Sequence, residues 1–519
     1  MSEKNQTVIV GGGISGLMAA LAAVERGETD VHVYEASNRL GGKVLSGRTS
    51  KEFGSRTINM GAEFIASEEK SMIELAQKLG VPLVPDGGGQ QKEIFQAPDG
   101  TMMPDFVQDY SKYYFAKTEK IRAEMEKDPQ LAEVMQSVSA ETFVNNLRNQ
   151  SAEHFINEQK VWAKPSWGIG DYLYAAGSWV YTQGEKIYSM AAGRPSQQIA
   201  DTALSAAQHE EGALAKNITA TQYMSEFAVT PDRFQACDCG LRVQGGTAAL
   251  IDALEAHLKK NNVQFHMNHK LEAVGKNGEE KILTFSGPDG EKIITTEKAV
   301  IALPAYVLPK IKGLELLKMD ENQVQYTKNV KFTVVTKPGA DLPEANAFFA
   351  NSQSWSPEEG LHTFLAHNEH GEDKDTVMKK VMANYAKAVG KRVEDIFYVD
   401  ANGKPVQGSY VYTNPGDAPC WSTPSPLNAA AIAKLFSKME ALAGQGLAFV
   451  GTYFPTPDGN TGFMECGAES VERMSDRMFG PPLLQAHEVG LSQQLSQPMP
   501  SLASRVRGAQ QEPGGGMHL

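Results

Sequence analysis

Three glycines near the start of the chain are spaced as a phosphate-binding turn. Gly11, Gly13 and Gly16 form the pattern Gly-x-Gly-x-x-Gly. In this pattern the first glycine permits a tight turn, the second lets the backbone approach a pyrophosphate, and the third lets a helix pack against a strand. The helix that follows would point the free backbone N–H groups of Ile14 and Ser15 at the phosphates. The spacing therefore predicts a dinucleotide site.

A strand, a helix and a second strand must hold this turn in place. The β-branched run at residues 7–10 predicts the first strand, and apolar residues at helical spacing over 17–24 predict the helix. Residues 31–34 predict the second strand, which ends at Glu35. A carboxylate there accepts hydrogen bonds from the adenosine ribose and repels a 2′-phosphate. Glycine-rich turns are common, but this order of elements favours dinucleotide binding over a merely structural turn.

Composition describes a soluble globular protein. The chain has 519 residues, 41% hydrophobic and 21% charged, so two or three domains are expected. A formal net charge of −13 disfavours nucleic acid as a partner and mildly favours cationic ligands. Four cysteines are too few for a disulfide framework in so long a chain, and their spacing is poor for zinc, so no metal site is expected.

The same cysteines fit a reducing compartment. The first residues, MSEKNQ, lack the basic and apolar regions of a signal peptide. No apolar run reaches the ~18 residues that a membrane-spanning helix needs. We therefore expect a cytoplasmic protein without a membrane anchor.

The segment after Glu35 carries a resemblance to a known family. It reads Ala36-Ser-Asn-Arg39-Leu-Gly-Gly42-Lys43, and it resembles the FAD-dependent amine oxidase superfamily, whose pattern here is Glu, three residues, Arg, one residue, Gly-Gly, then Arg or Lys. In that family the segment wraps the pyrophosphate side of FAD, so these four numbered residues are implied cofactor contacts. The alternative is a solvated basic loop.

Three further stretches resemble parts of the same FAD site. Asn59-Met-Gly-Ala-Glu-Phe-Ile65 resembles the family's segment beside the flavin ring, with Asn59 in place of the usual Asp. The stretch beginning at Leu241 resembles the second FAD segment, and 447–470 resembles the closing motif, in which a helix N-terminus faces the flavin pyrimidine. The implied cofactor contacts in these stretches are Gly61, Ala62, Glu63, Leu271 (through its backbone at the adenine), Gly451, Thr452, Gly462, Phe463 and Met464.

The resemblance also implies three catalytic residues. Family oxidases place a lysine on a strand, where it holds a water near flavin N5 and helps the reduced flavin react with oxygen. Lys331 is preferred for this role over Lys328, because its spacing to Lys337 matches the oxidase pattern. Trp421 and Phe463 are the implied aromatic walls of a substrate cage, and Cys420 leaves covalent flavin attachment open.

The substrate class is less clear from the sequence. Amino-acid oxidases of the superfamily commonly carry an arginine after the Gly-Ala segment to grip the α-carboxylate, and here that position is Glu63. Glu63 would suit a distant ammonium, which favours amines, although Arg194 or another residue of the inserted domain could bind a carboxylate.

These features predict an α/β fold. It would consist of a discontinuous Rossmann-like FAD-binding domain, a mixed-sheet substrate domain and an inserted helical region at about 105–235. The expected ranges are 1–90, 236–302 and 440–485 for the FAD-binding domain, 91–235 and 303–439 for the substrate domain, and 486–519 for a mobile tail.

The function that the resemblance implies is oxidation of an amine. Hydride would pass from the carbon bearing nitrogen to flavin N5, giving an imine and, with molecular oxygen, hydrogen peroxide. The expected partners are a small amine or amino acid and oxygen, in a possible homodimer. Two alternatives stay open. One is another flavin enzyme of this fold, such as an L-amino-acid oxidase, a desaturase or a mutase. The other is a binding scaffold without flavin, as in Rab escort proteins.

Overall fold

The structure is a computed structural model, and it describes most of the chain. The described residues are 3–66, 69–85, 94–149, 152–162, 197–211, 215–216, 218–226, 240–318, 324–327, 329–340, 342, 347–349, 352–368, 371–413, 421–424, 429–454 and 464–482. The predicted tail, 486–519, lies outside them.

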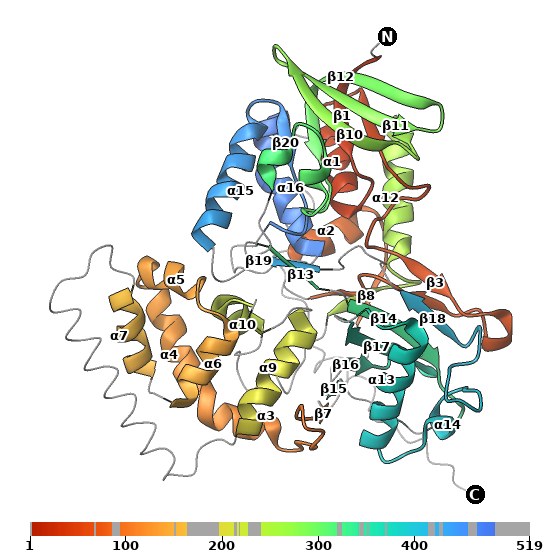
Figure 1. Cartoon of the computed structure of the whole chain (residues 1–519). Coiled ribbons are helices and arrows are strands. Elements are labelled where there is room, and N and C mark those ends of the chain that lie inside the picture. The colour runs from red at the N-terminus through yellow and green to blue at the C-terminus, as the bar shows by residue number, and fades with distance from the viewer. Residues whose placement is uncertain are drawn as a thin grey trace, which may run out of the picture.

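A seven-stranded sheet organises one part of the molecule, with strand order β10-β11-β12-β1-β2-β9 and β20 paired to β12 (Figure 1). Its parallel strands are β1 (Glu3–Val10), β2 (Val31–Tyr34), β9 (Gln264–His266), β12 (Gly290–Ile301) and β20 (Leu447–Phe449). The antiparallel strands β10 (Lys270–Asn277) and β11 (Glu280–Gly287) extend it beyond β12. Strands from the beginning, middle and end of the described chain thus share one sheet.

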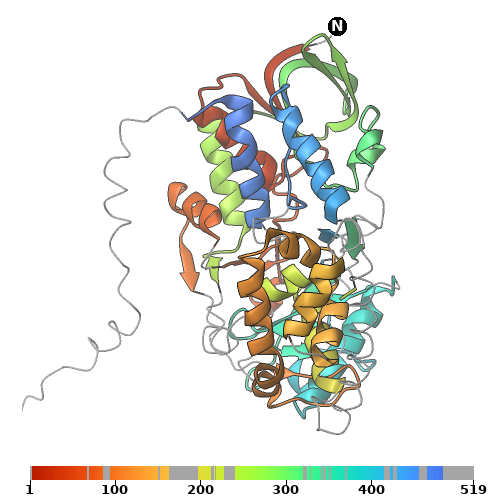
Figure 2. The same ribbon diagram turned by 90° about the vertical axis from the view of Figure 1, so that its left-hand side faces the viewer.

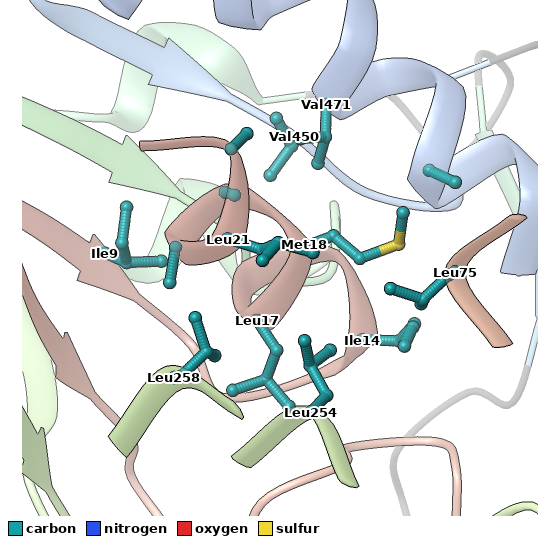
Figure 3. Close-up of a cluster of buried hydrophobic side chains, with 14 of the residues drawn as sticks. Ile9, Ile14, Leu17, Met18, Leu21, Leu75, Leu254, Leu258, Val450 and Val471 are labelled. Carbon is teal, nitrogen blue, oxygen red and sulfur yellow. The ribbon is translucent and has the colours of Figure 1, made fainter. Parts of the chain in front are cut away.

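Helices α1 (Ile14–Glu25), α12 (Ala248–Lys260) and α16 (Met464–Phe479) lie side by side in one layer (Figure 2). Helix α1 is in the middle, so every residue from 14 to 23 is buried. Leu17 packs towards α12, while Met18 and Leu21 lie on the side of α16 (Figure 3). Helix α2 (Lys70–Lys78) joins the same cluster through Leu75. This packing fixes the first turn of α1, where the predicted dinucleotide site begins.

A second, mixed sheet has the strand order β18-β14-β17-β16-β15-β7. Its strands are β7 (Ile94–Phe95), β14 (Asn329–Val335), β15 (Ala347–Phe349), β16 (Ser352–Trp355), β17 (Leu361–His367) and β18 (Tyr410–Thr413). Only β7 and β15 run parallel among these pairs. Helix α13 (Lys374–Ala388) packs on this sheet, and the short α14 (Val393–Ile396) follows it.

A helical region, formed by the described residues between 106 and 226, lies beside the second sheet (Figure 1). Its helices are α3 (Phe106–Tyr110), the π-helix Ser111–Phe115, α4 (Ala116–Met125), α5 (Pro129–Met135), α6 (Ala140–Asn149), α7 (Ala152–Trp162), α9 (Gln197–Glu211) and α10 (Ala220–Glu226). Aromatic side chains fill its core, among them Phe106, Tyr110 and Phe143.

Helix α15 (Ala429–Ala443) packs beside β20 of the first sheet. The remaining elements are short: β3 (Ser46–Arg48), β4 (Thr57–Asn59), β5 (Phe64–Ile65), β6 (Leu83–Pro85), β8 (Leu241–Val243), β13 (Val324–Thr327), β19 (Trp421–Pro424) and the 3-10 turns Lys51–Phe53, Leu308–Lys310 and Glu315–Leu317. The fold is of the predicted mixed α/β class. In the described part of the chain, no helix has both the length and the apolar character needed to cross a membrane.

Candidate active site

The three glycines of the first turn are glycine for different structural reasons. Gly11 has φ +103°, and a Cβ there would lie 2.5 Å from the carbonyl oxygen of Ala302. A Cβ on Gly16 would lie 1.9 Å from the carbonyl oxygen of Gly11. Packing within the protein therefore excludes a side chain at both positions. Gly13 differs from these two positions. A Cβ on Gly13 would have the Cα of Gly42, at 3.8 Å, as its nearest atom among the described residues other than its chain neighbours.

Glu35 ties the end of β2 to this turn. One carboxylate oxygen accepts a hydrogen bond from the Gly12 N–H at 2.7 Å. The other accepts from the N–H and the hydroxyl of Ser37, at 2.8 and 2.7 Å. These contacts hold the carboxylate at the mouth of the glycine turn.

The basic loop after Glu35 folds against the same turn. The backbone N–H of Gly41 donates to the carbonyl of Gly12 at 2.8 Å. Arg39 donates to the carbonyl of Gly42 at 2.7 Å. Lys43 donates to the hydroxyl of Thr452 at 3.2 Å, which connects the loop to the residues before α16. The loop thus brings two cations to the region where the first and last predicted FAD segments meet.

Lys331 reaches out of β14 to the predicted flavin-facing segment. Its Nζ donates to Oε2 of Glu63 at 2.6 Å and to the backbone carbonyl of Gly61 at 3.0 Å. Both side chains are largely removed from solvent, with exposed fractions of 12% for Lys331 and 4% for Glu63. The preferred catalytic lysine and the Gly-Ala-Glu segment therefore form one cluster, although they lie far apart in the sequence.

Two residues that the sequence analysis did not single out complete this cluster. The Arg242 guanidinium on β8 lies 3.5 Å from Oε1 of Glu63, and it also donates to the backbone carbonyl of Pro357. The Lys331 Nζ lies 5.3 Å from the ring centroid of Trp355. Local sequence carries no signal for these contacts, because the partners come from separate strands.

The partners of Glu63 bear on the expected substrate class. From the sequence, Glu63 would suit the distant ammonium of a substrate. In the structure its two oxygens face Lys331 and Arg242, and its side chain is buried. A buried carboxylate requires such partners, because removing its charge from water is costly.

Asn59 supports the same segment from the other side. Its Oδ1 accepts hydrogen bonds from the N–H and the hydroxyl of Thr247, at 2.9 and 3.1 Å. Thr247 directly precedes α12, so the amide oxygen satisfies a donor at that helix's N-terminus. Asn59 thus joins the segment that is predicted to face the flavin to α12.

Helix α16 begins at Met464, which is buried. Glu465, the next residue, accepts hydrogen bonds from the backbone N–H groups of Ser71 and Met72, at 2.9 and 3.0 Å. The N–H of Gly451 donates to the hydroxyl of Ser470 at 3.0 Å. These contacts fix the start of α16, while Gly462 and Phe463 lie outside the described residues.

The predicted aromatic cage is described only in part. The Trp421 backbone lies in β19, where its Cα pairs with that of Thr327 in β13. This pairing brings Trp421 to the segment that runs into β14 and Lys331. Lys328 and Cys420 lie outside the described residues. The Leu271 side chain belongs to a buried cluster with Val8, Tyr34 and Phe285, and its Cα pairs with that of Phe285 in β11.

Most of the chain matches one protein family. Residues 14–401 match the family described as flavin containing amine oxidoreductase. The chain belongs to this family. It is therefore an oxidoreductase, and its cofactor is FAD.

Individual relatives of this flavin amine oxidoreductase match it over short segments. Putrescine oxidase of Kocuria rosea is 31% identical over 124 residues, which is 24% of each chain. The flavin-containing amine oxidase B of Homo sapiens is 35% identical over 81 residues, or 16% of this chain and 15% of that protein. The chain thus spans less than a quarter of the length of the curated relatives in these matches.

Solved structures match over nearly the whole chain. Wild-type putrescine oxidase bound to putrescine has a TM-score of 0.64 at 13% identity, covering 93% of this chain and 100% of that one. Cyclohexylamine oxidase from Brevibacterium oxydans IH-35A has a TM-score of 0.63 at 15% identity, covering 92% and 99%. At this identity the likeness shows the fold.

The residues of this flavin amine oxidoreductase fit FAD. A Cβ on Gly13 would meet no described atom closer than 3.8 Å, chain neighbours apart, whereas Gly11 and Gly16 are crowded by backbone atoms, so the backbone at Gly13 is the least obstructed of the three. A carboxylate at Glu35 suits a ribose diol, and cations at Arg39 and Lys43 suit phosphates. Among the described residues, no group of three or more His, Cys, Asp or Glu is placed to hold a metal ion.

Proposed function

We propose that this flavin amine oxidoreductase oxidises a small amine at the carbon that bears the nitrogen, with oxygen as the final acceptor and an imine and hydrogen peroxide as products. The observation that carries the proposal is the contact of Lys331 with Gly61 and Glu63. It brings the lysine of the oxidase pattern to the segment that resembles the flavin-facing one. The amine-specific names of the putrescine and cyclohexylamine oxidases support the same substrate class.

FAD supplies hydride acceptance, and the protein supplies position and electrostatics. We assign the pyrophosphate to Gly11, Gly13 and the first N–H groups of α1, because a helix N-terminus favours anions. We assign the ribose hydroxyls to Glu35. The remaining assignments for the cofactor are Gly16, Ala36, Arg39, Gly42, Lys43, Gly61, Ala62, Leu271, Gly451, Thr452, Gly462, Phe463 and Met464.

The N-terminus of α16 is assigned to the pyrimidine end of the flavin. Its partial positive charge there stabilises negative charge on the reduced ring. This role requires a helix start that does not move, and Glu465 provides it by accepting from two backbone N–H groups of α2.

The amine must be neutral when it gives up hydride. Aromatic walls disfavour the ammonium form, because a charged group loses hydration between them. We assign this role to Trp421 and Phe463, and no dedicated protein base is needed. Lys331 would hold a water on the flavin side and offer positive charge to the oxygen that takes up electrons.

We also propose the division into an FAD-binding part (1–90, 236–302 and 440–485) and a substrate-binding part (91–235 and 303–439). The proposal is supported by the composition of the two large sheets. The first takes strands from 3–34, 264–301 and 447–449, and the second from 94–95 and 329–413.

The test is anaerobic mixing of the FAD-loaded protein with a panel of monoamines, diamines and L-amino acids. Bleaching of the flavin band by amines, followed by peroxide formation when air is admitted, is the expected result. Bleaching by L-amino acids alone would replace the amine proposal with an amino-acid oxidase. A flavin band that none of the panel bleaches would refute the proposal and favour another reaction of this fold.

A further inference from the structure

Lys331 belongs to a largely buried cluster of three charged side chains, with Glu63 and Arg242. Glu63 lies between the Lys331 ammonium and the Arg242 guanidinium, and each of its oxygens has one cation beside it. The exposed fractions of the side chains are 4% for Glu63, 12% for Lys331 and 16% for Arg242. The three residues come from separate elements: Glu63 directly precedes β5, Arg242 lies on β8 and Lys331 lies on β14.

Glu63 limits the directions in which Lys331 can donate. An ammonium has three N–H donors. One is used by Oε2 of Glu63 at 2.6 Å, and a second by the backbone carbonyl of Gly61 at 3.0 Å. The face of Trp355, with its centroid 5.3 Å from Nζ, also attracts the positive charge. Within the described part of the chain, one donor therefore remains, and the two hydrogen bonds fix the position from which it is offered.

Arg242 fixes Glu63 in turn. It approaches Oε1 of Glu63 at 3.5 Å, and its guanidinium is anchored by the carbonyl of Pro357. The planar guanidinium can serve two acceptors at once without losing its geometry. The carboxylate is thus held from the side opposite the lysine.

We propose that Glu63 is the positioning residue for Lys331, with Arg242 as its anchor, and that this pairing removes Glu63 from substrate recognition. The inference rests on the proposed function, in which Lys331 acts beside the flavin. The expectation from the sequence that Glu63 contacts the flavin is replaced in this proposal by a role through Lys331. Glu63 acts by keeping the remaining Lys331 donor aimed at one place.

The first part of the test measures the reaction of the reduced flavin with oxygen by stopped flow. Lys331→Met is expected to slow this reaction by at least about tenfold, equivalent to ~1.4 kcal/mol of barrier. Glu63→Gln is expected to slow it by a similar factor. The double variant should be no slower than Lys331→Met, because residues that act as a unit are not additive.

The matched control is Glu28→Gln. Glu28 is also a buried, ion-paired glutamate, with Lys298 and the Thr7 hydroxyl as its partners. It lies outside the cluster, so its loss should lower the Tm without changing the rate of flavin reoxidation. A slow Glu28→Gln variant would show that any buried charge loss disturbs the flavin, and would overturn the assignment to Glu63.

The second part separates position from charge. Glu63→Asp keeps the charge but shortens the side chain by one methylene. A positioning role predicts slow reoxidation at a flavin midpoint potential close to that of the unchanged protein. A wild-type rate in Glu63→Asp would overturn the proposal, and this variant decides the matter if Glu63→Gln does not fold.

The FAD-free protein gives an independent readout. Thermal unfolding of Glu63→Gln, Lys331→Met and the double variant should show coupling, with the double variant losing less Tm than the sum of the single losses. Additive losses would contradict the pairing of these two side chains.

A third readout concerns the substrate. If Glu63 is not a substrate contact, Glu63→Gln changes the KM values of a diamine and a monoamine of equal chain length by the same factor. A rise in KM for the diamine alone would overturn this part of the proposal. An unchanged reoxidation rate in Lys331→Met would instead refute the role of Lys331 in the proposed function, so the two failures are distinguishable.

Discussion

Alanine at Gly13 should separate FAD binding from folding. The backbone at this position is extended, with φ −73° and ψ 174°, which alanine adopts without strain. The nearest described atom to the new Cβ, chain neighbours apart, would be 3.8 Å away, an ordinary contact. The FAD-free variant should therefore be as stable as the parent, or more stable by ~0.4–1 kcal/mol, because alanine restricts the unfolded chain.

The same methyl group would fill the space assigned to the pyrophosphate. Displacing a phosphate costs at least one charge-assisted hydrogen bond, worth ~1.5–3 kcal/mol. Gly13→Ala should therefore weaken FAD binding by ~10- to 100-fold or more. Isothermal titration of the FAD-free protein with FAD measures this loss.

Gly16→Ala is the matched comparison. Its Cβ would lie 1.9 Å from the carbonyl oxygen of Gly11, so the turn or α1 must shift. Overpacking of this kind costs ~1–3 kcal/mol, and urea unfolding of the FAD-free protein should show that loss. The reasoning is refuted if Gly13→Ala destabilises the FAD-free protein as much as Gly16→Ala, or if it binds FAD normally.

Three further predictions concern residues around the site and the second sheet. Burial lowers the pKa of His362 from 6.5 to about 3. The unfolded chain therefore binds a proton on His362 more tightly than the folded protein does, so the free energy of unfolding should fall as pH drops below 6.5, by about 2 kcal/mol at pH 5. Urea unfolding at pH 7 and pH 5 measures this fall, and His362→Gln should lack it. An equal fall in both proteins would contradict the prediction. Asn59→Ala removes the acceptor of the Thr247 N–H and hydroxyl, and should lower unfolding free energy by ~1–3 kcal/mol; a change within ±0.5 kcal/mol, as for ordinary surface substitutions, would argue against that bond. Glu35→Gln removes the carboxylate that accepts from Gly12, and should weaken FAD binding by about tenfold, or 1.4 kcal/mol, in the same titration; unchanged affinity would refute the ribose assignment.

The first βαβ unit could be predicted because its signals are local. The β-branched run, the glycine turn and the acid after the second strand lie within residues 7–35, and the structure has β1, α1 and β2 there. The hydrophobic periodicity and the residue types of the turn suffice to predict such a unit, because every contacting residue is close in sequence. The mixed α/β class followed from the order of such units.

The surroundings of Lys331 could not be predicted in the same way. The lysine itself was found through a pattern, but its partner Glu63 is 268 residues away in the chain. Arg242 comes from a third segment, on a strand of three residues. Such pairings depend on tertiary packing. A carboxylate that the sequence suggests for substrate binding can instead form ion pairs with cations of the protein itself.

The most direct test of the central claim is a single-turnover comparison of one amine that carries either hydrogen or deuterium on the carbon bearing nitrogen. The amine is chosen from those that bleach the flavin, and the rate of anaerobic bleaching is measured by stopped flow at saturating amine. Hydride transfer from that carbon predicts that the deuterated amine bleaches the flavin several-fold more slowly, with the imine or its aldehyde or ketone hydrolysis product formed in equal amount. The account would be contradicted if the two amines bleached the flavin at equal rates although flavin reduction is the rate-limiting step. It would also be contradicted if the flavin bleached without formation of the imine or its hydrolysis product.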